Sequence, residues 1–404
     1  MHLLLVEDNV HGLYPFSVMH CAWELRCGPE RFFEAWTRLL RPESQAWSGR
    51  ESHVASFNAR FPGPLPATSI SPILAVRSSL VPSQAVCDTI RATDAPFVRF
   101  LLAGTVVALR TPRGVPLAAS HLLGDEALPD APWVDVTVDG MRVTDLHQTL
   151  DLVGSSIDAS LSRFGPSWSD TGRMFPGVFC LRPDRVHVGA DVRIDPCVVL
   201  DATDGAIIID ANVHIRSHSV IMGPCFIGSD SRIKAGAKIY ANTVIGEWCK
   251  VGGEVENSII HAYSNKQHEG FLGHSHIGEW VNLGADTNTS DLKNTYGPIR
   301  ITRRSQPVET GRMFLGLLCG DHVKSGIDTM FTTGTVCGIH ANVFGAGYAP
   351  QEIPSFAWGA IGDERRYPLK KALAVASTVM SRRGRTLHAE EVALMEEEWD
   401  AFSR

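Results

Sequence analysis

Four histidines lie close together in HAYSNKQHEGFLGHSH, residues 261–276, where they could act as bases or as metal ligands. A neutral imidazole can take a proton from an amine near pH 7. A zinc site would also need thiolate or carboxylate ligands at a suitable spacing. No such spacing occurs around His261, His268, His274 and His276, so the sequence favours proton transfer and predicts no metal site.

His268 belongs to a unit that interrupts a regular repeat. Aliphatic residues recur every six positions, at Ile209, Ile215, Ile221, Ile227, Ile233, Ile239, Ile245 and Val251. The fifth position of each unit is small or β-branched, from Val213 and Ser219 to Cys249 and Val255. This pattern predicts a prism of short parallel strands with three units in each coil of about 18 residues. Ile209, Ile227 and Ile245 should then stack in one column, and Ile215, Ile233 and Val251 in another.

The unit NKQHEG, residues 265–270, has no aliphatic residue. Because nothing apolar would anchor it to the core, we expect it to form a loop or bulge that presents His268 beside the prism. Taken alone, a solvated loop histidine would explain the same residue.

The rest of the chain predicts an α/β domain, a linker and a helical tail around the repeat. Residues 1–165 mix strand-like and helix-like segments, with a strand at Leu3–Val6, a helix broken near Gly28-Pro29 within 22–40, and a strand or hairpin at 97–109. Residues 166–185 are rich in Gly, Pro and Ser and suggest a linker. The repeat occupies 186–360, and 361–404 should be helical.

Composition narrows the class of protein. The 404 residues are 44% hydrophobic and 20% charged, which is typical of a soluble globular protein. The formal charge of -7 argues against nucleic acid as a partner. No apolar run reaches the roughly 18 residues that cross a membrane, and MHLLLVEDN is too short and acidic for a signal peptide. The nine cysteines form no C-x-x-C pair, which indicates reduced thiols in a cytoplasmic protein.

Several stretches resemble one bacterial family. IKAGAKIY (233–240), CKVGGEVENSII (249–260), YSNKQHEGFLGHSHIGEWVNLGADTNTSDLKNTYG (263–297) and FLGLLCGDHVKSGIDTMFTTGTVCG (314–338) are similar to the GlmU-like family of hexapeptide-repeat proteins. That family joins a sugar-nucleotidyltransferase-like α/β domain to a left-handed parallel β-helix acyltransferase domain. The resemblance implies both parts here, with a C-terminal helical cap.

The resemblance also implies roles for individual residues. The family's general base is followed by x-x-aromatic-Leu-Gly, which corresponds to His268 before Phe271, Leu272 and Gly273. Phe271 stands where the family often has Tyr. The acyl donor would be acetyl-CoA or another acyl-CoA, bound in the later coils by a set that we expect to include Lys324, Ser325, Thr333 and Gly334.

Polar residues near the motif suit a sugar phosphate. Asn282 offers donors and acceptors for hydroxyl groups, and Asp291 could accept from an ammonium or hydroxyl group while Lys293 offsets its charge. The resemblance implies a phosphate-binding role for Lys234, where related acetyltransferases place an arginine, and Lys250 lies one coil away. The absence of lysine before 234 favours this use of both residues. Turn formation by Asn282 and Asp291 remains an alternative.

The α/β domain lacks the usual phosphate loop of sugar nucleotidyltransferases. Its first strand is followed by EDNVHGLYPFSVMH, which has one glycine, Gly12, and no Gly-x-Gly. Arg26 is the one cation near the expected site, and a surface role explains it equally well. The sequence therefore predicts a reduced phosphate site, which binds a nucleotide sugar or nothing.

Three functions remain open from the sequence. The first is acyl transfer to the amine of an amino-sugar phosphate or nucleotide-linked sugar, in a homotrimer. The second is sugar-1-phosphate nucleotidyl transfer of the UDP-N-acetylglucosamine type, requiring Mg²⁺, with the β-helix as a trimerising scaffold. The third is a non-catalytic assembly protein. The complete His268 motif favours the first.

Overall fold

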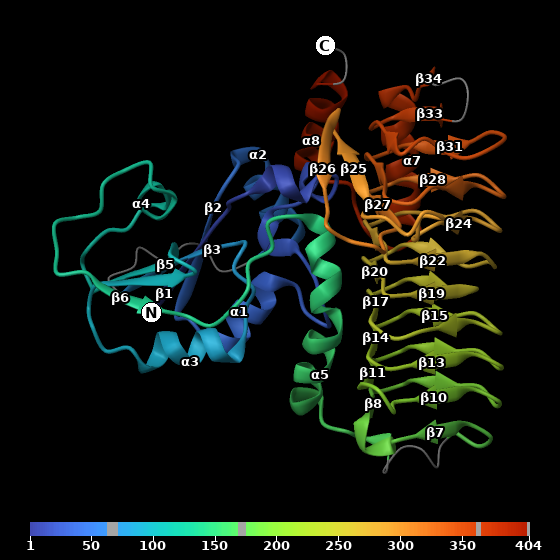
Figure 1. Cartoon of the computed structure of the whole chain (residues 1–404), viewed down its shortest axis with the longest axis horizontal. Helices are drawn as coiled ribbons and strands as arrows, with labels where there is room; N and C mark the ends of the chain where they lie inside the picture. The colour runs from blue at the N-terminus through green and yellow to red at the C-terminus, as the bar shows by residue number, and fades with distance from the viewer. Residues whose placement is uncertain (63–71, 169–174, 361–364, 402–404) are drawn as a thin grey trace.

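The computed structural model describes residues 1–62, 72–168, 175–360 and 365–401. It has an N-terminal α/β part, a parallel β-helix and two C-terminal helices, so the predicted fold class is confirmed. Figure 1 shows the β-helix as a column of stacked coils, with the helix α5 between it and the N-terminal sheet. None of the described helices is long and apolar enough to cross a membrane.

The N-terminal sheet has six strands in the order β2-β1-β3-β5-β4-β6. The predicted strand and hairpin are confirmed, because β1 includes the residues predicted for the strand and β4 pairs antiparallel with β5. The predicted broken helix is a 3-10 turn, η3 (Ala22–Glu24), followed by α1. The strands are β1 (His2–Val6), β2 (Ser44–Ser48), β3 (Ile73–Arg77), β4 (Val98–Leu102), β5 (Thr105–Thr111) and β6 (Val134–Thr137). The helices are α1 (Phe32–Leu40), α2 (Glu51–Arg60), α3 (Gln84–Ala92), α4 (Ala119–Leu123), η4 (Leu146–Leu152) and α5 (Val153–Phe164).

The β-helix has three faces, which we name A, B and C so that the chain passes from A to B to C in each coil. Face A contains β8 (Val186–Val188), β11 (Ile207–Ile209), β14 (Cys225–Ile227), β17 (Thr243–Ile245), β20 (Ile259–Ile260), β23 (His276–Ile277), β27 (Leu317–Cys319), β30 (Thr335–Cys337) and β32 (Glu352–Ile353). Face B contains β9 (Arg193–Ile194), β12 (His214–Ile215), β15 (Arg232–Ile233), β18 (Lys250–Val251), β21 (Asn265–Lys266), β28 (Lys324–Ser325), β31 (Asn342–Phe344), β33 (Ala357–Ala360) and β34 (Arg365–Arg366).

Face C contains β7 (Phe179–Leu181), β10 (Val199–Asp201), β13 (Val220–Met222), β16 (Lys238–Ile239), β19 (Glu254–Glu256) and β22 (Phe271–Gly273), and β24 (Asn288–Thr289) and β29 (Met330–Phe331) continue it. β7 pairs with β10, so the β-helix begins at Phe179, inside the segment expected to be a linker. Part of that segment, 169–174, lies outside the described residues. Corners AB, BC and CA are the turns between these faces.

The predicted aliphatic columns are confirmed. Ile227 lies in register with both Ile209 and Ile245 on face A. Ile233 lies in register with both Ile215 and Val251 on face B. All six side chains have no exposed surface, so each coil covers the apolar side chains of the next.

Only the first two residues of the NKQHEG unit lie in the sheet, so the expected loop is limited to the turn at residues 267–270. Asn265 and Lys266 form β21, and Lys266 takes the core position above Val251. The Lys266 side chain is 3% exposed, and its Nζ donates to the His268 carbonyl oxygen at 2.7 Å. A long flexible stem therefore fills the apolar column, and its ammonium group closes the following turn.

The N-terminal part covers face A. Outward-facing apolar residues of this face are buried against the N-terminal segment and α5, among them Ile208, Phe226, Val244, Ile259, Leu318 and Val336. The hairpin of β25 (Arg300–Arg303) and β26 (Gln306–Glu309) is inserted between β24 and β27, and Arg303 binds Asp145 at 2.7 Å. The C-terminal helices are α7 (Leu369–Ser381) and α8 (Ala389–Ala401). Face A is thus covered by other parts of the chain.

We predict that Lys266→Met stabilises the protein at pH 7 and removes part of its pH dependence. Burial lowers the pKa of Lys266 from its usual 10.5 to about 8. Between these values the unfolded lysine binds the proton and the folded one does not, so stability rises with pH in this window. Below pH 8 the full destabilisation is present, about 3 kcal/mol from the pKa difference.

Thermal melts of Lys266→Met and the exposed control Lys371→Met at pH 7 and pH 10 check this prediction. The gain from Lys266→Met should be largest at pH 7 and should shrink as pH rises from 8 toward 10.5. A lower melting temperature for Lys266→Met at pH 7 would show that its hydrogen bond outweighs its burial.

Candidate functional site

His268 lies at corner BC, in the turn that joins β21 to β22. Its side chain is exposed, and its ring makes no hydrogen bond to another described residue. The turn is held from both ends, by Lys266 at the His268 carbonyl and by Gly270, where a Cβ would lie 2.2 Å from the Thr287 carbonyl oxygen. A fixed backbone thus presents a free imidazole.

Face B places three of the predicted binding residues in one outward row. Lys250 is in register with Asn265, Asn265 with Asn282, and Asn282 with Lys324. Neighbouring strands lie about 4.8 Å apart, so this row is a continuous strip beside corner BC. Asn265 was not predicted, although the repeat places it one coil after Lys250.

A cluster of cations surrounds Lys250. Burial lowers the pKa of Lys250 first, and the positive charges of Arg383, Lys234, Arg382 and Arg232 lower it further. Arg383 also donates to Asn265 Oδ1 at 3.5 Å. Arg382 and Arg383 directly follow α7, and the sequence does not reveal the position of this helix. This cluster favours an anionic ligand on face B.

The other predicted substrate residues do not join this strip. Phe271 opens β22 on face C, directly after the His268 turn, and its backbone N–H donates to Asn288 Oδ1 at 2.8 Å. Asp291 lies at the far end of face C, where its Oδ2 is 2.7 Å from His274 Nδ1. Lys293 Nζ donates to the Pro298 carbonyl at 2.8 Å, in the insertion. Asp291 and Lys293 are therefore separated from Lys250 and Asn282.

The four residues expected to bind the acyl donor do not form one site. Lys324 lies on face B, but the Ser325 side chain points into the core, where it accepts from Gly284 N at 2.9 Å and contacts Thr287 Oγ1 at 2.7 Å. Thr333 lies at corner CA, with its hydroxyl 2.9 Å from Ser290, and Gly334 is buried. Of this set, only Lys324 belongs to the face B strip. Lys324 and Ser325 are adjacent in β28, and because side chains alternate within a strand, one points outward and the other inward.

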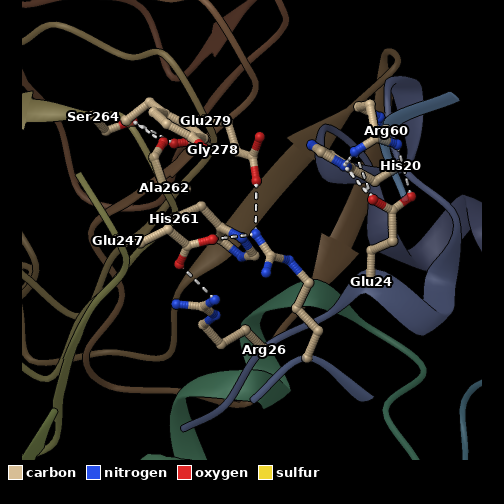
Figure 2. Close-up of polar contacts among 12 residues, drawn as sticks. His20, Glu24, Arg26, Arg60, Glu247, His261, Ala262, Ser264, Gly278 and Glu279 are labelled. Carbon is tan, nitrogen blue, oxygen red and sulfur yellow. Dashed lines mark hydrogen bonds and ion pairs between the residues drawn. The ribbon is translucent and has the colours of Figure 1, made fainter. Parts of the chain in front are cut away.

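Arg26 joins the N-terminal part to the β-helix. Its Nη2 donates to Glu247 Oε2 at 2.8 Å, and Arg31 binds the other oxygen of Glu247 at 2.6 Å. Figure 2 shows these contacts beside Glu279 and the Arg60–Glu24 pair. Arg26 is 3% exposed, so it is a docking residue and is not open to a phosphate.

Glu7 and Asp8, the carboxylates that follow β1, form ion pairs with nearby arginines. Glu7 binds Arg50 at 2.9 Å, and Asp8 binds Arg142 at 3.1 Å. A triphosphate at this strand end would meet two buried carboxylates, which is the reverse of a phosphate-binding loop.

The histidines of the 261–276 stretch lie in three different environments. The Nε2 atoms of His261 and His276 lie 3.3 Å apart in the buried contact with the N-terminal part. Burial lowers the pKa of both, to about 3 for His276, so these rings stay neutral at pH 7. His274 and His268 lie on opposite corners of face C. Sequence reasoning missed the His274–Asp291 pair, which their spacing of nearly one coil could have suggested.

Known proteins are similar to part of this chain. No family model matches it. The bifunctional protein GlmU of Methanococcus aeolicus is 35% identical over 179 residues, 42% of each chain. A bifunctional sugar-1-phosphate nucleotidylyltransferase/acetyltransferase of Sulfurisphaera tokodaii is 29% identical over 142 residues, 35% of each chain. An uncharacterized acetyltransferase of Escherichia coli K12, YaiX, is 28% identical over 197 residues, 46% of this chain and 86% of that protein.

The matched segments span less than half the length of the first two relatives. The Sulfurisphaera tokodaii and Escherichia coli proteins are named as acetyltransferases, and the Methanococcus aeolicus protein is named as bifunctional. These similarities confirm the resemblance of this chain to the GlmU-like family, which the motifs of its β-helix predict.

Proposed function

We propose that the chain transfers an acyl group from an acyl-CoA, such as acetyl-CoA, to the amine of an amino sugar that carries a phosphate or nucleotide. The observation that carries this proposal is the free imidazole of His268, held at corner BC beside the cationic strip of face B. An imidazole suits the proton transfer, and the cations suit the phosphates of both substrates.

The reaction needs few groups from the protein. His268 takes a proton from the amine as its nitrogen attacks the thioester carbonyl. The carbon–sulfur bond then breaks, and the imidazolium returns the proton to the departing thiolate. The products are an amide and free coenzyme A. Lys234, Lys250, Arg382 and Arg383 would hold phosphate groups, and Asn282, exposed in the same strip, would bind a hydroxyl group.

Nucleotidyl transfer, which the name of the Sulfurisphaera tokodaii relative includes, receives less support from the structure. It would require Mg²⁺ and cations for a triphosphate at the end of β1. Arg26 is committed to Glu247, and Arg50 and Arg142 to Glu7 and Asp8. We infer that this activity is absent or weak.

We also propose a homotrimer in which a neighbouring chain covers corner BC. With only one chain at corner BC, a thioester bound beside His268 would be half exposed to solvent. Two exposed apolar residues follow in later coils on this side, Ile327 with 74% and Tyr348 with 67% of the side chain exposed. A partner chain would bury them, and cyclic symmetry suits a prism with three faces.

We predict that His268→Ala abolishes acyl transfer and leaves stability unchanged. Loss of a general base slows a reaction by about 10²- to 10⁴-fold, and an exposed side chain contributes about 0.5 kcal/mol or less. The buried control Ile239→Ala should do the opposite, with a loss of roughly 2–5 kcal/mol and normal turnover per folded molecule.

Thermal melts and coenzyme A release, measured on both variants, check this prediction. If His268→Ala melts early and turns over normally, His268 is a structural residue and the proposed base is wrong.

We predict a trimer in solution, with a mass near three times the 44.0 kDa of one chain by light scattering. Ile327→Asp should reduce the mass to that of one chain, because it places a charge in the proposed contact. Phe179→Asp is the control, since Phe179 is 65% exposed but lies at the opposite end of the β-helix. A monomeric wild-type protein at micromolar concentration contradicts the proposal.

A further inference from the structure

A cavity of about 440 Å³ lies where α5 meets corner CA. Its polar lining comes from three parts of the chain, with Asn242, Asn257 and His274 from consecutive coils, Asp151 and Ser155 from η4 and α5, and Arg312 from the insertion. Gly154 allows this approach of α5, because a Cβ there would lie 2.5 Å from Asn242 Oδ1. A cavity of this size can hold one sugar ring.

His274 is oriented within this cavity by two neighbours. Its Nδ1 lies 2.7 Å from Asp291 Oδ2, and its ring stacks on Phe314 with the ring centres 5.1 Å apart. The carboxylate accepts the Nδ1–H group and so holds the tautomer in which Nε2 carries a lone pair. Nε2 has no partner among the described residues, so it can accept a hydrogen bond from a ligand.

The charges of the cavity disfavour phosphate. Arg312 Nη1 binds both oxygens of Asp151, at 2.7 and 2.6 Å, and its Nε donates to the Phe314 carbonyl at 3.2 Å. The guanidinium charge is thus offset, and the carboxylate of Asp291 adds a negative charge. A phosphate group would gain no free cation here, in contrast to face B.

The remaining groups suit hydroxyl and ammonium groups. The amides of Asn242 and Asn257 and the hydroxyl of Ser155 each offer donors and acceptors. The lone pair at His274 Nε2 requires a donor, and the nearby carboxylates favour a cation over a neutral group. Hydroxyl groups and one ammonium group on a single ring are the chemistry of an amino sugar.

We propose that this cavity is a binding site for an unphosphorylated amino sugar, with His274 Nε2 as the acceptor for its ammonium or hydroxyl group. The site is separate from corner BC, and the proposal does not depend on acyl transfer by His268.

Calorimetric titration of the whole chain with D-glucosamine at pH 7 tests the proposal. His274→Ala should weaken binding by about tenfold or more, as expected for losing one desolvated hydrogen bond. Asp291→Asn keeps the shape of the side chain, but its amide group donates to His274 Nδ1. The proton of His274 then lies on Nε2, which faces the ammonium group as a donor, so binding should weaken as well. His268→Ala is the matched control and should keep the wild-type affinity.

The outcomes separate this site from corner BC. Binding that survives His268→Ala and is lost in a folded His274→Ala variant, as judged by its melting temperature, supports the cavity, whether or not acyl transfer occurs. Wild-type protein that does not bind D-glucosamine, or binding lost in His268→Ala and retained in His274→Ala, overturns the proposal.

Discussion

Contact between the inward-facing aliphatic residues of successive coils fixes where every other side chain of the β-helix points. Ile209, Ile227 and Ile245 stack without exposed surface, and so do Ile215, Ile233 and Val251. Because these columns set the register, residues one coil apart in the sequence become neighbours on a face. Groups that could hold one anionic ligand are thereby gathered from distant positions, such as Lys250, Asn282 and Lys324 on face B.

Lys266 shows how this constraint can serve a site. A lysine in an apolar column is costly to bury, as its lowered pKa shows. The chain keeps β21 in register and uses the ammonium group to bind the carbonyl of His268. The position of the exposed imidazole is therefore tied to a buried column of the β-helix, which favours a defined geometry for proton transfer.

The N-terminal part docks on face A, and the candidate site lies on face B. Apolar residues such as Phe226 and Val244 are buried in this contact, and the Arg26–Glu247 and His20–Asp321 pairs surround it. Partnered charges of this kind are costly to separate, because each would leave an unpaired buried charge. Arg26, the one cation that the sequence placed near a nucleotide site, thus joins the N-terminal part to the β-helix.

The repeat could be predicted from the sequence because its signal is local and repeated. The columns and the outward position of Lys250 follow directly from the period. The shortened coil, the insertion after β24 and the position of α7 could not be predicted, because they depend on tertiary contacts. Gly252 and Gly253 form a short turn that shortens one coil. Asp291, after β24, lies beside His274. The end of α7 brings Arg382 and Arg383 to face B. Ser325 was expected to bind the acyl donor, but its hydroxyl forms hydrogen bonds with Thr287 and Gly284 inside the core.

The most direct test of the central claim is to incubate the purified chain with acetyl-CoA and a panel of amino-sugar phosphates and nucleotide-linked amino sugars. Free thiol and acylated sugar are measured together by mass spectrometry. The account predicts one N-acylated sugar for each coenzyme A released, with at least one member of the panel. Thiol release that does not depend on any sugar, or no acylated product from the whole panel, would contradict it.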